Sequence, residues 1–360
     1  MRVEKSHFGN TPLGHPVTRF TLYNDRKISV SIINLGAAVQ AFIVPDRNGV
    51  FDDIILGYND AEGYWLDTNY MGAVIGRYAN RIAYGRFILK GVSYNLSLNH
   101  GAHHLHGGTI GFDKRLWNAV PVEGEDGVSL TLKRVSEDGE EGYPGNLMVA
   151  VTYSLNNDNE LGIQYLAETD RPTPVNLSSH GYFNLSGNHS TAIDSHIIWI
   201  NANHFLPVDS EFIPTGEISP VSDTPLDFRK PTAINKRINS GDAQLARVGG
   251  YDHNWVLNNH DGKIKLQSSV YDEGSGRLLE VHTSEPGLQF YSGNSLCSRF
   301  HGKSGSAHQR RQGLCLETQH FPNSPNQPGF PSTILHPGGT YRSETIYRFK
   351  LKSGSKYQPS

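Results

Sequence analysis

The stretch LMVAVTYSLNNDNELGIQYLAET, residues 147–169, decides the fold class that the sequence predicts. Apolar residues alternate with polar ones in both of its halves, at Leu147, Val149, Val151, Tyr153 and Leu155, and again at Leu161, Ile163, Tyr165 and Ala167. A period of two is typical of a β-strand with one buried face. Residues 156–159 (NNDN) between the halves favour a tight turn. The stretch therefore predicts a β-hairpin.

Similar alternating runs recur along the chain, and Gly, Asn or Asp separates most of them. The composition agrees with sheet structure, because 38 glycines, 17 tyrosines and 15 phenylalanines accompany only 19% charged residues. Helical patterning is scarce, and only residues 242–250 (DAQLARVGG) predict a short helix, with Asp242 as N-cap and Gly249 beyond its end. We expect an all-β protein, a large antiparallel β-sandwich.

No linker or shift in composition divides the sequence, so we expect a single domain over residues 1–360. The proline-rich segment 321–332 (FPNSPNQPGFPS) predicts a rigid surface loop beside an important site. The formal net charge of −3 gives no reason to expect a nucleic-acid or membrane partner. Two cysteines, Cys297 and Cys315, and an N-terminus without an apolar leader favour a reduced, cytoplasmic location.

Residues 99–108 (NHGAHHLHGG) form a histidine-rich segment with several possible roles. Its histidines are His100, His103, His104 and His106. If the segment is extended, His104 and His106 share one face and could bind a metal ion, as in cupin-type sites. No carboxylate follows closely, so a third ligand would have to come from elsewhere in the chain. The alternatives are a solvated loop, or a ligand-binding loop in which Gly107 and Gly108 let the backbone approach the ligand.

Five further polar residues stand in segments that could line a binding site. Asn80 and Arg81 in ANRIAYG (79–85) offer directed donors to an oxygen-rich ligand, although the end of a surface strand would look the same. His180 and Tyr182 in PTPVNLSSHGYFNLSG (172–187) can point the same way along a strand. His180 suits proton transfer, whereas a hydrogen-bonded structural histidine is the simpler interpretation. Glu317 in GLCLETQ (313–319) is either a buried general base or part of an exposed face.

Two more candidates lie in GGYDHNW (249–255) and EPGLQFYSGN (285–294). Asp252 in the first segment can accept hydrogen bonds from hydroxyl groups. Gln289 in the second lies, together with Tyr291, on the strand face opposite Leu288 and Phe290. Both residue types suit the binding of a polyhydroxylated ligand.

Six motifs in this order resemble the galactose mutarotase (aldose 1-epimerase) family. They are GRYANRIAYG, HHLHGGTIGFDKRLW, TPVNLSSHGYFNL, GGYDHNW, PGLQFYSGN and LCLETQHFPNSPNQP, and they span residues 76–328. Flanking stretches also fit, so the resemblance covers nearly the whole chain. It implies a β-super-sandwich with a sugar cleft on one sheet. It also implies an isomerase of carbohydrate metabolism that interconverts the α and β anomers of free aldohexoses such as D-galactose and D-glucose.

The resemblance also implies roles for individual residues. By motif match, Glu317 is the general base, His180 the general acid and His106 a second active-site histidine. The substrate-binding positions are Asn80, Arg81, Tyr182, Asp252 and Gln289. The resemblance calls for no metal and no cofactor, and the partner that it implies is a free sugar.

Ring opening of an aldose explains why one base and one acid suffice. The base removes the proton of the anomeric hydroxyl, and the acid protonates the ring oxygen as the bond from C1 to O5 breaks. We expect Glu317 to be ionised and His180 to keep its proton in the free site because a carboxylate is near.

Three other functions remain open from the residues alone. A glycoside hydrolase could use Glu317 and Asp252 as its pair of carboxylates. A carbohydrate-binding protein could bind sugar without catalysis. A cupin-like enzyme could hold a metal ion at the histidines.

Overall fold

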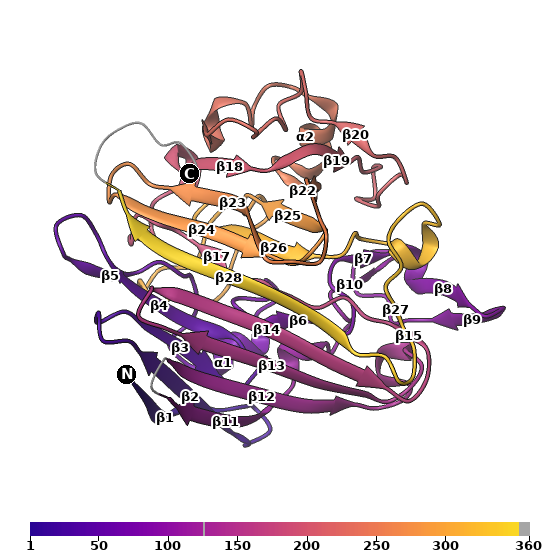
Figure 1. Cartoon of the computed structure of the whole chain (residues 1–360), viewed down its shortest axis with the longest axis horizontal. Coiled ribbons are helices and arrows are strands. Elements are labelled where there is room, and N and C mark those ends of the chain that lie inside the picture. The colour runs from indigo at the N-terminus through magenta and orange to yellow at the C-terminus, as the bar shows by residue number, and fades with distance from the viewer. Residues whose placement is uncertain (125–126, 353–360) are drawn as a thin grey trace.

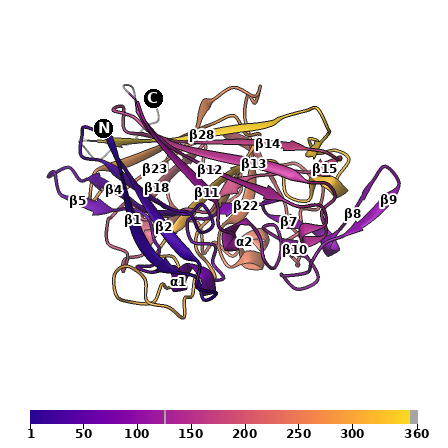
Figure 2. The same cartoon turned by 90° about the horizontal axis from the view of Figure 1, so that it is seen from below.

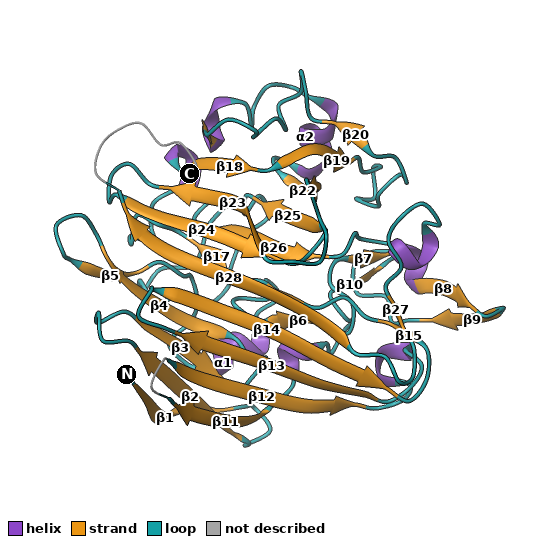
Figure 3. Cartoon of the chain, in the orientation of Figure 1, coloured by secondary structure: helices purple, strands orange, loops and turns teal. Residues whose placement is uncertain are grey.

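The structure is a computed structural model that describes residues 1–124 and 127–352. Strands dominate it, and its few short helices lie around the sheets (Figure 3). The predicted hairpin is present as β13 (Leu147–Leu155) and β14 (Glu160–Thr169), with Leu155 opposite Leu161 next to the turn. All five apolar positions of the predicted face of β13 are buried. The alternation in the sequence therefore predicted the hairpin and its buried face correctly.

The hairpin belongs to a nine-stranded antiparallel sheet with the order β11-β12-β13-β14-β28-β24-β23-β18-β21. This sheet forms one broad layer across the front of the molecule (Figure 1). Its other strands are β11 (Asn118–Glu123), β12 (Val128–Ser136), β18 (Ile197–Ile200), β21 (Thr232–Ala233), β23 (Lys265–Tyr271), β24 (Arg277–Thr283) and β28 (Tyr341–Leu351).

Two further antiparallel sheets pack against the nine-stranded one. The first contains β1 (Arg2–Asn10), β2 (Pro16–Tyr23), β3 (Ser29–Ile33), β4 (Val39–Pro45) and β5 (Phe51–Asp53) in chain order. The second has the order β17-β26-β25-β22-β19-β20. Its strands are β17 (Tyr182–Phe183), β19 (Ala202–Leu206), β20 (Ser219–Pro220), β22 (Asp252–Leu257), β25 (Gly287–Tyr291) and β26 (Leu314–Gln319).

Four pairs of short strands complete the architecture. They are β6 (Val74–Ile75) with β16 (Ser178–Ser179), β7 (Arg81–Ile82) with β10 (His104–Leu105), β8 (Arg86–Leu89) with β9 (Val92–Asn95), and β15 (Thr173–Pro174) with β27 (Ile334–Leu335). The β8–β9 hairpin projects from the body of the molecule (Figure 1). The pairs β6–β16 and β7–β10 each join segments that are distant in the sequence.

The helices are short and lie on the side of the molecule away from the nine-stranded sheet (Figure 2). The predicted helix is confirmed as α2 (Ala243–Val248): the Asp242 side chain caps its N-terminus, and Gly249 ends it with a left-handed φ of 72°. The sequence did not lead us to expect α1 (Ala61–Leu66), which Asp60 caps. Single 3₁₀ turns are η1 (Ala83–Gly85), η2 (Phe112–Lys114), η3 (Glu140–Gly142), η4 (Ile193–Ser195), η5 (Ile234–Lys236) and η6 (Ser324–Asn326).

One hydrophobic core joins the three large sheets. Its members include Val151 and Tyr165 from the nine-stranded sheet, Phe42 from β4, and Phe290 and Leu316 from the six-stranded sheet. Side chains from facing sheets meet in this core, which is the arrangement of a β-sandwich. The expected all-β antiparallel sandwich is confirmed. In the described part of the chain, no helix combines the length and apolar character that a membrane crossing requires.

Candidate active site

Strand β26 presents different side chains to its two sides. Leu314 and Leu316 enter the core, so Cys315 and Glu317 point to the opposite face of the six-stranded sheet. Strand pairing places Gln289 opposite Glu317 and Tyr291 opposite Cys315. The pairing of β22 with β25 then places Asp252 opposite Tyr291. Sheet register therefore gathers these side chains on one face.

Segments above this face supply the remaining candidates. The pairing of β7 with β10 sets Leu105 opposite Arg81, and the His106 amide donates to the Asn80 carbonyl at 3.1 Å. His180 follows β16 and is fixed by its backbone, since its amide donates to the Ala73 carbonyl at 2.9 Å. Residues from three distant parts of the chain are thereby placed together.

A cavity of about 190 Å³ lies between these segments and the sheet. Seven of the eight candidate residues from the sequence line this cavity: Asn80, Arg81, His106, His180, Tyr182, Asp252 and Glu317. The other lining residues are Thr68, Asn69, Tyr70, His100, Leu105, Phe212, Val248, Tyr291 and Ser295. The lining combines polar groups with aromatic rings, which suits a small ligand with many hydroxyl groups.

Gln289 is the candidate that does not line this cavity. Its Nε2 donates to Oδ1 of Asp252 at 2.7 Å, so it lies directly beside a lining residue. It borders a much smaller cavity of about 10 Å³ together with Asn254. In this structure Gln289 orients the Asp252 carboxylate.

Glu317 and His180 face each other across a short distance. Oε1 of Glu317 lies 3.7 Å from Nε2 of His180, and both side chains are buried. The other carboxylate oxygen, Oε2 of Glu317, has no hydrogen-bond partner among the described residues. A buried carboxylate oxygen without a partner is costly, so this atom is a good acceptor for a ligand hydroxyl.

Burial sets the protonation of both groups. It raises the pKa of Glu317 well above its usual value, and Asp252 raises it further while Arg81 opposes the shift. Burial lowers the pKa of His180 to about 4. The free site thus favours a neutral His180 and a protonated Glu317, unlike the ionised Glu317 and protonated His180 that we expected. Burial disfavours the charged form of each group more strongly than attraction across 3.7 Å favours the charged pair.

His106 has a defined tautomer. Its Nδ1 accepts a hydrogen bond from the Asn80 amide at 3.1 Å. Burial lowers the pKa of His106 well below its usual value, with His180 and Arg81 adding to the effect. A neutral ring with Nδ1 as acceptor carries its proton on Nε2. His106 can therefore donate one hydrogen bond from Nε2.

His106, His180 and Glu317 are also the residues that could hold a metal ion. Ligand atoms of His106, His180 and Glu317 lie within 4.8 Å of one another, so the group could surround an ion. A metal-binding histidine usually donates a hydrogen from its second nitrogen. Nδ1 of His106 instead accepts one from Asn80, which leaves the proton on Nε2 and makes that nitrogen a donor. The contacts of His106 thus favour hydrogen bonding to a ligand over coordination of a metal ion.

Arg81 is held in place from several sides. Its NH2 atom lies 3.8 Å from Oδ2 of Asp252, and its guanidinium carbon lies 5.3 Å from the centre of the Phe212 ring. The Asn323 amide donates to the Arg81 carbonyl at 2.8 Å. Asn323 belongs to the proline-rich segment, which we expected to be a surface loop. Only part of the segment is at the surface, because its first residues, including Phe321, are buried. The contact with Arg81 places the segment beside the cavity, which agrees with the prediction that it lies next to an important site.

The histidine-rich segment is not extended throughout, so the condition under which His104 and His106 would share a face is not met. His106 has a left-handed φ of 53°, which ends the strand alternation after β10. Gly107 and Gly108 were expected to let the backbone approach a ligand. A Cβ on Gly107 would lie 1.6 Å from the carbonyl oxygen of Gly76, so this glycine permits close backbone packing.

His104 is a structural residue outside the cavity. Its Nδ1 lies 2.8 Å from the Ser97 carbonyl, and its Nε2 lies 2.7 Å from the Tyr143 hydroxyl. The carbonyl can only accept, so Nδ1 carries the proton and Nε2 accepts from Tyr143. Burial lowers the pKa of His104 to about 4, although the hydrogen bond to the Ser97 carbonyl and the charge of Glu141 oppose the shift.

This neutral His104 predicts a loss of stability in acid. The folded pKa lies below the unfolded value of 6.5, so the unfolded state binds the proton first as pH falls from 6.5 towards 4. The free energy of unfolding should fall by about 2 kcal/mol between pH 7.5 and pH 5 from this group alone. Urea denaturation of the chain and of His104→Gln at both pH values measures it. A difference between the two proteins that does not change with pH contradicts the prediction.

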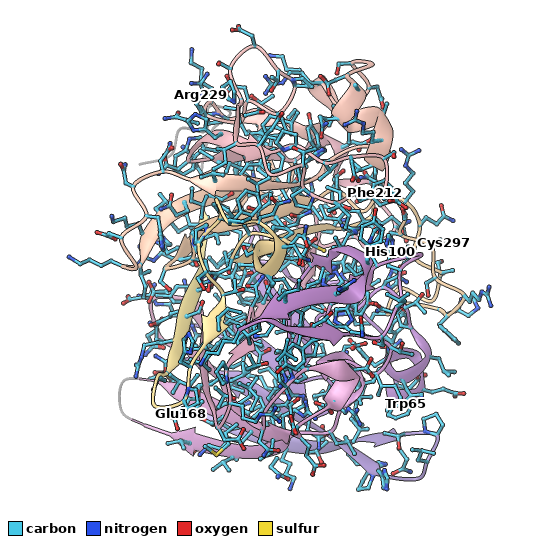
Figure 4. All side chains as sticks on the ribbon, turned by 90° about the vertical axis from the view of Figure 1, so that its right-hand side faces the viewer. Trp65, His100, Glu168, Phe212, Arg229 and Cys297 are labelled. Atoms are coloured by element: carbon cyan, nitrogen blue, oxygen red, sulfur yellow. The ribbon has the colours of Figure 1, made fainter. Side chains whose placement is uncertain are left out.

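The sequence did not identify several aromatic residues of the cavity. Tyr70 lies with its ring centre 4.7 Å from that of His106 and 5.8 Å from that of His180. Phe212 and His100 come from distant segments and lie side by side at the surface, with ring centres 6.0 Å apart (Figure 4). Tyr70 and Phe212 lie in loops without a periodic pattern, whereas Tyr291 shared a predicted strand face with Gln289. That shared strand face was the only feature of the sequence that could have identified one of these aromatic residues.

Comparisons with known proteins extend over nearly the whole chain. The family model described as "Aldose 1-epimerase" matches residues 18–348. A galactose mutarotase of Bos taurus is 45% identical over 350 residues, which cover 97% of this chain and 99% of the bovine protein. An aldose 1-epimerase of Escherichia coli is 38% identical, over 94% of this chain and 96% of its own.

The fold agrees with solved structures as well. The crystal structure of a galactose 1-epimerase from Lactobacillus acidophilus superposes with a TM-score of 0.86 and 27% sequence identity. The superposition covers 98% of this chain and 100% of the other. Sequence and structure thus agree on one group of relatives.

Proposed function

Because the chain belongs to the aldose 1-epimerase family, we propose that Glu317 and His180 are the base and the acid with which it acts on its sugar. The chain is an isomerase of carbohydrate metabolism that interconverts the α and β anomers of free aldohexoses. D-galactose and D-glucose are the substrates that we propose, and the relatives named galactose mutarotase favour galactose.

The observation that carries this proposal is the position of Glu317. A buried carboxylate with one unpartnered oxygen faces His180 at 3.7 Å inside a cavity of polar and aromatic residues. Ring opening needs a base at O1 and an acid at O5, which are bonded to the same carbon. The pair of side chains is close enough to serve both atoms of one anomeric centre.

Sugar binding supplies the charges that the free site lacks. A hydroxyl that donates to Oε2 of Glu317 stabilises the carboxylate, and a ring oxygen that accepts from Nε2 of His180 stabilises the imidazolium. At every stage Glu317 and Nε2 of His180 together hold one exchangeable proton. Glu317 takes the proton from O1, the bond from C1 to O5 breaks, and His180 gives its proton to O5. After rotation about the bond from C1 to C2, the same transfers run in reverse.

The remaining lining residues bind and orient the sugar in this proposal. Nε2 of His106 donates a hydrogen bond to a sugar oxygen. Arg81 and Asp252 bind neighbouring hydroxyl groups as donor and acceptor, and Asn80 and Tyr182 complete the polar wall. Gln289 contributes through Asp252, to which it is hydrogen-bonded.

We also propose the setting in which the enzyme acts. The free thiols of Cys297 and Cys315 support a reducing, cytoplasmic location. The core shared by three sheets supports a single domain, although residues 125–126 and 353–360 of the proposed range 1–360 lie outside the described part. The net charge of −3 supports a free sugar as the partner, without nucleic acid or membrane.

Polarimetry on freshly dissolved sugar tests the function. Catalytic amounts of the protein should bring α-D-galactose and α-D-glucose to anomeric equilibrium at least about 10²-fold faster than buffer. The rates across a panel of free aldoses give the substrate preference. Equilibration at the rate of buffer alone would contradict the function.

Two matched measurements exclude the rival activities. Methyl α-D-galactoside has no anomeric hydroxyl proton, so an epimerase leaves it unchanged whereas a glycoside hydrolase releases reducing sugar. Treatment with EDTA followed by dialysis should leave the epimerase rate unchanged. A rate that falls with EDTA and returns with added metal would support the cupin-like alternative.

A further inference from the structure

Cys315 is a buried contact of His180 on the side of the ring away from Glu317. The Cys315 sulfur lies 3.5 Å from Nδ1 of His180, a normal distance for a hydrogen bond to sulfur. Nε2 of the same ring lies 3.7 Å from Oε1 of Glu317. The two nitrogens of His180 thus face different partners, the thiol on one side and the reacting centre on the other.

The acid role constrains the tautomer of His180. A group that gives a proton to the ring oxygen and later takes it back must do both at the atom that faces the sugar. That atom is Nε2, so the neutral ring needs an unprotonated Nε2 and a proton on Nδ1. A proton on Nδ1 needs an acceptor, and the nearby sulfur has lone pairs for it.

Resting on the proposed function, we propose that the Cys315 sulfur accepts a hydrogen bond from Nδ1 of His180 and so keeps Nε2 free to exchange its proton with the sugar. Cys315 is then a positioning residue, because it acts through His180 and does not touch the reacting atoms. It resembles the carboxylate that orients a catalytic histidine in other enzymes, except that it carries no charge.

The surroundings of Cys315 keep it in this role. Its side chain is fully buried, and burial raises the pKa of the thiol well above its usual value. It therefore stays uncharged and adds no negative charge near Glu317. Tyr182, its pairing partner on β17, belongs to the same buried cluster and limits the movement of the Cys315 side chain. A carboxylate in this position would hold the proton on the ring. The neutral thiol orients the ring and still lets it give up its proton.

Histidine NMR on the full-length protein tests the tautomer directly. With ¹⁵N-labelled histidine near pH 7.5, and His180→Gln to identify the signals, His180 should carry its proton on Nδ1. In Cys315→Val, which fills a similar volume without an acceptor, the proton should move to Nε2. A wild-type ring with its proton on Nε2 would mean that the thiol donates, and would overturn the proposal. This measurement does not depend on catalysis, so it decides even if the proposed function fails.

Kinetics separate the hydrogen bond from simple packing. Cys315→Val should lower kcat about 10-fold with KM changed less than about 3-fold, because one hydrogen bond to the charged ring is lost. Cys315→Ser retains an acceptor and should recover most of this loss. The basic limb of the kcat profile, which reports protonated His180 in the sugar complex, should move to lower pH in Cys315→Val. Equal rates for the two variants would contradict the proposal. Cys297→Ser, which changes the exposed thiol, is the matched control and should behave as wild type.

Discussion

Replacing Glu317 by glutamine should slow mutarotation about 10³-fold while the protein remains folded. Glutamine has nearly the same shape and can still form hydrogen bonds, but it cannot take the proton of the anomeric hydroxyl. Polarimetry with α-D-galactose measures the rate, and circular dichroism reports on the fold. A variant within a few-fold of wild type would show that Glu317 is not the base.

The same variant should gain stability. The folded pKa of Glu317 is raised, so its contribution to stability is complete below pH 4.5 and declines as pH rises through the folded pKa. Glutamine does not ionise, so this position no longer causes stability to decline as pH rises. Glu317→Gln should therefore melt at a higher temperature than wild type at pH 8, with a smaller difference at pH 5. Loss of rate together with gain of stability distinguishes a functional carboxylate from a structural one.

Replacing His180 by glutamine should slow the reaction about 10²- to 10³-fold, because the ring oxygen then loses its proton donor. The double variant with Glu317→Gln should be hardly slower than either single variant, since the two groups transfer protons in the same step. Multiplicative losses in the double variant would contradict this paired action.

His103→Gln is the matched control for this change. His103 belongs to the same histidine-rich segment but contacts the Tyr84 amide and lies 3.6 Å from Glu211. It does not line the cavity. We expect its rate to remain within a few-fold of wild type. A large loss of rate in this variant would mean that the segment acts through more than His106.

Strand structure was predictable where side chains alternate over several residues. The hairpin of β13 and β14 has two regular apolar faces and turn residues between them, so local information sufficed. Helix α2 was predictable because Asp242 and Gly249 mark both of its ends. Helix α1 occupies a single stretch of six residues, too short for an apolar period to stand out.

The candidate site was predictable as a set of residues but not as a geometry. Motifs led to seven residues that line one cavity, yet only the three-dimensional structure reveals that Gln289 is hydrogen-bonded to the Asp252 carboxylate. His106 has a left-handed backbone, and the next residue, Gly107, packs closely against the Gly76 carbonyl, a tertiary contact that the sequence alone does not show. Protonation was wrongly expected for His180, because the degree of burial is a property of the assembled sheets.

The alternation of β26 makes the molecule intolerant of insertions in one particular place. Leu314 and Leu316 face the core while Cys315 and Glu317 face the cavity, so one added residue within the strand would exchange the two sets. Such a change would bury the acidic group in the core and expose the leucines at the same time. A change in length should be tolerated better in a projection such as the β8–β9 hairpin, where the chain can lengthen or shorten and leave the strand that carries Glu317 untouched.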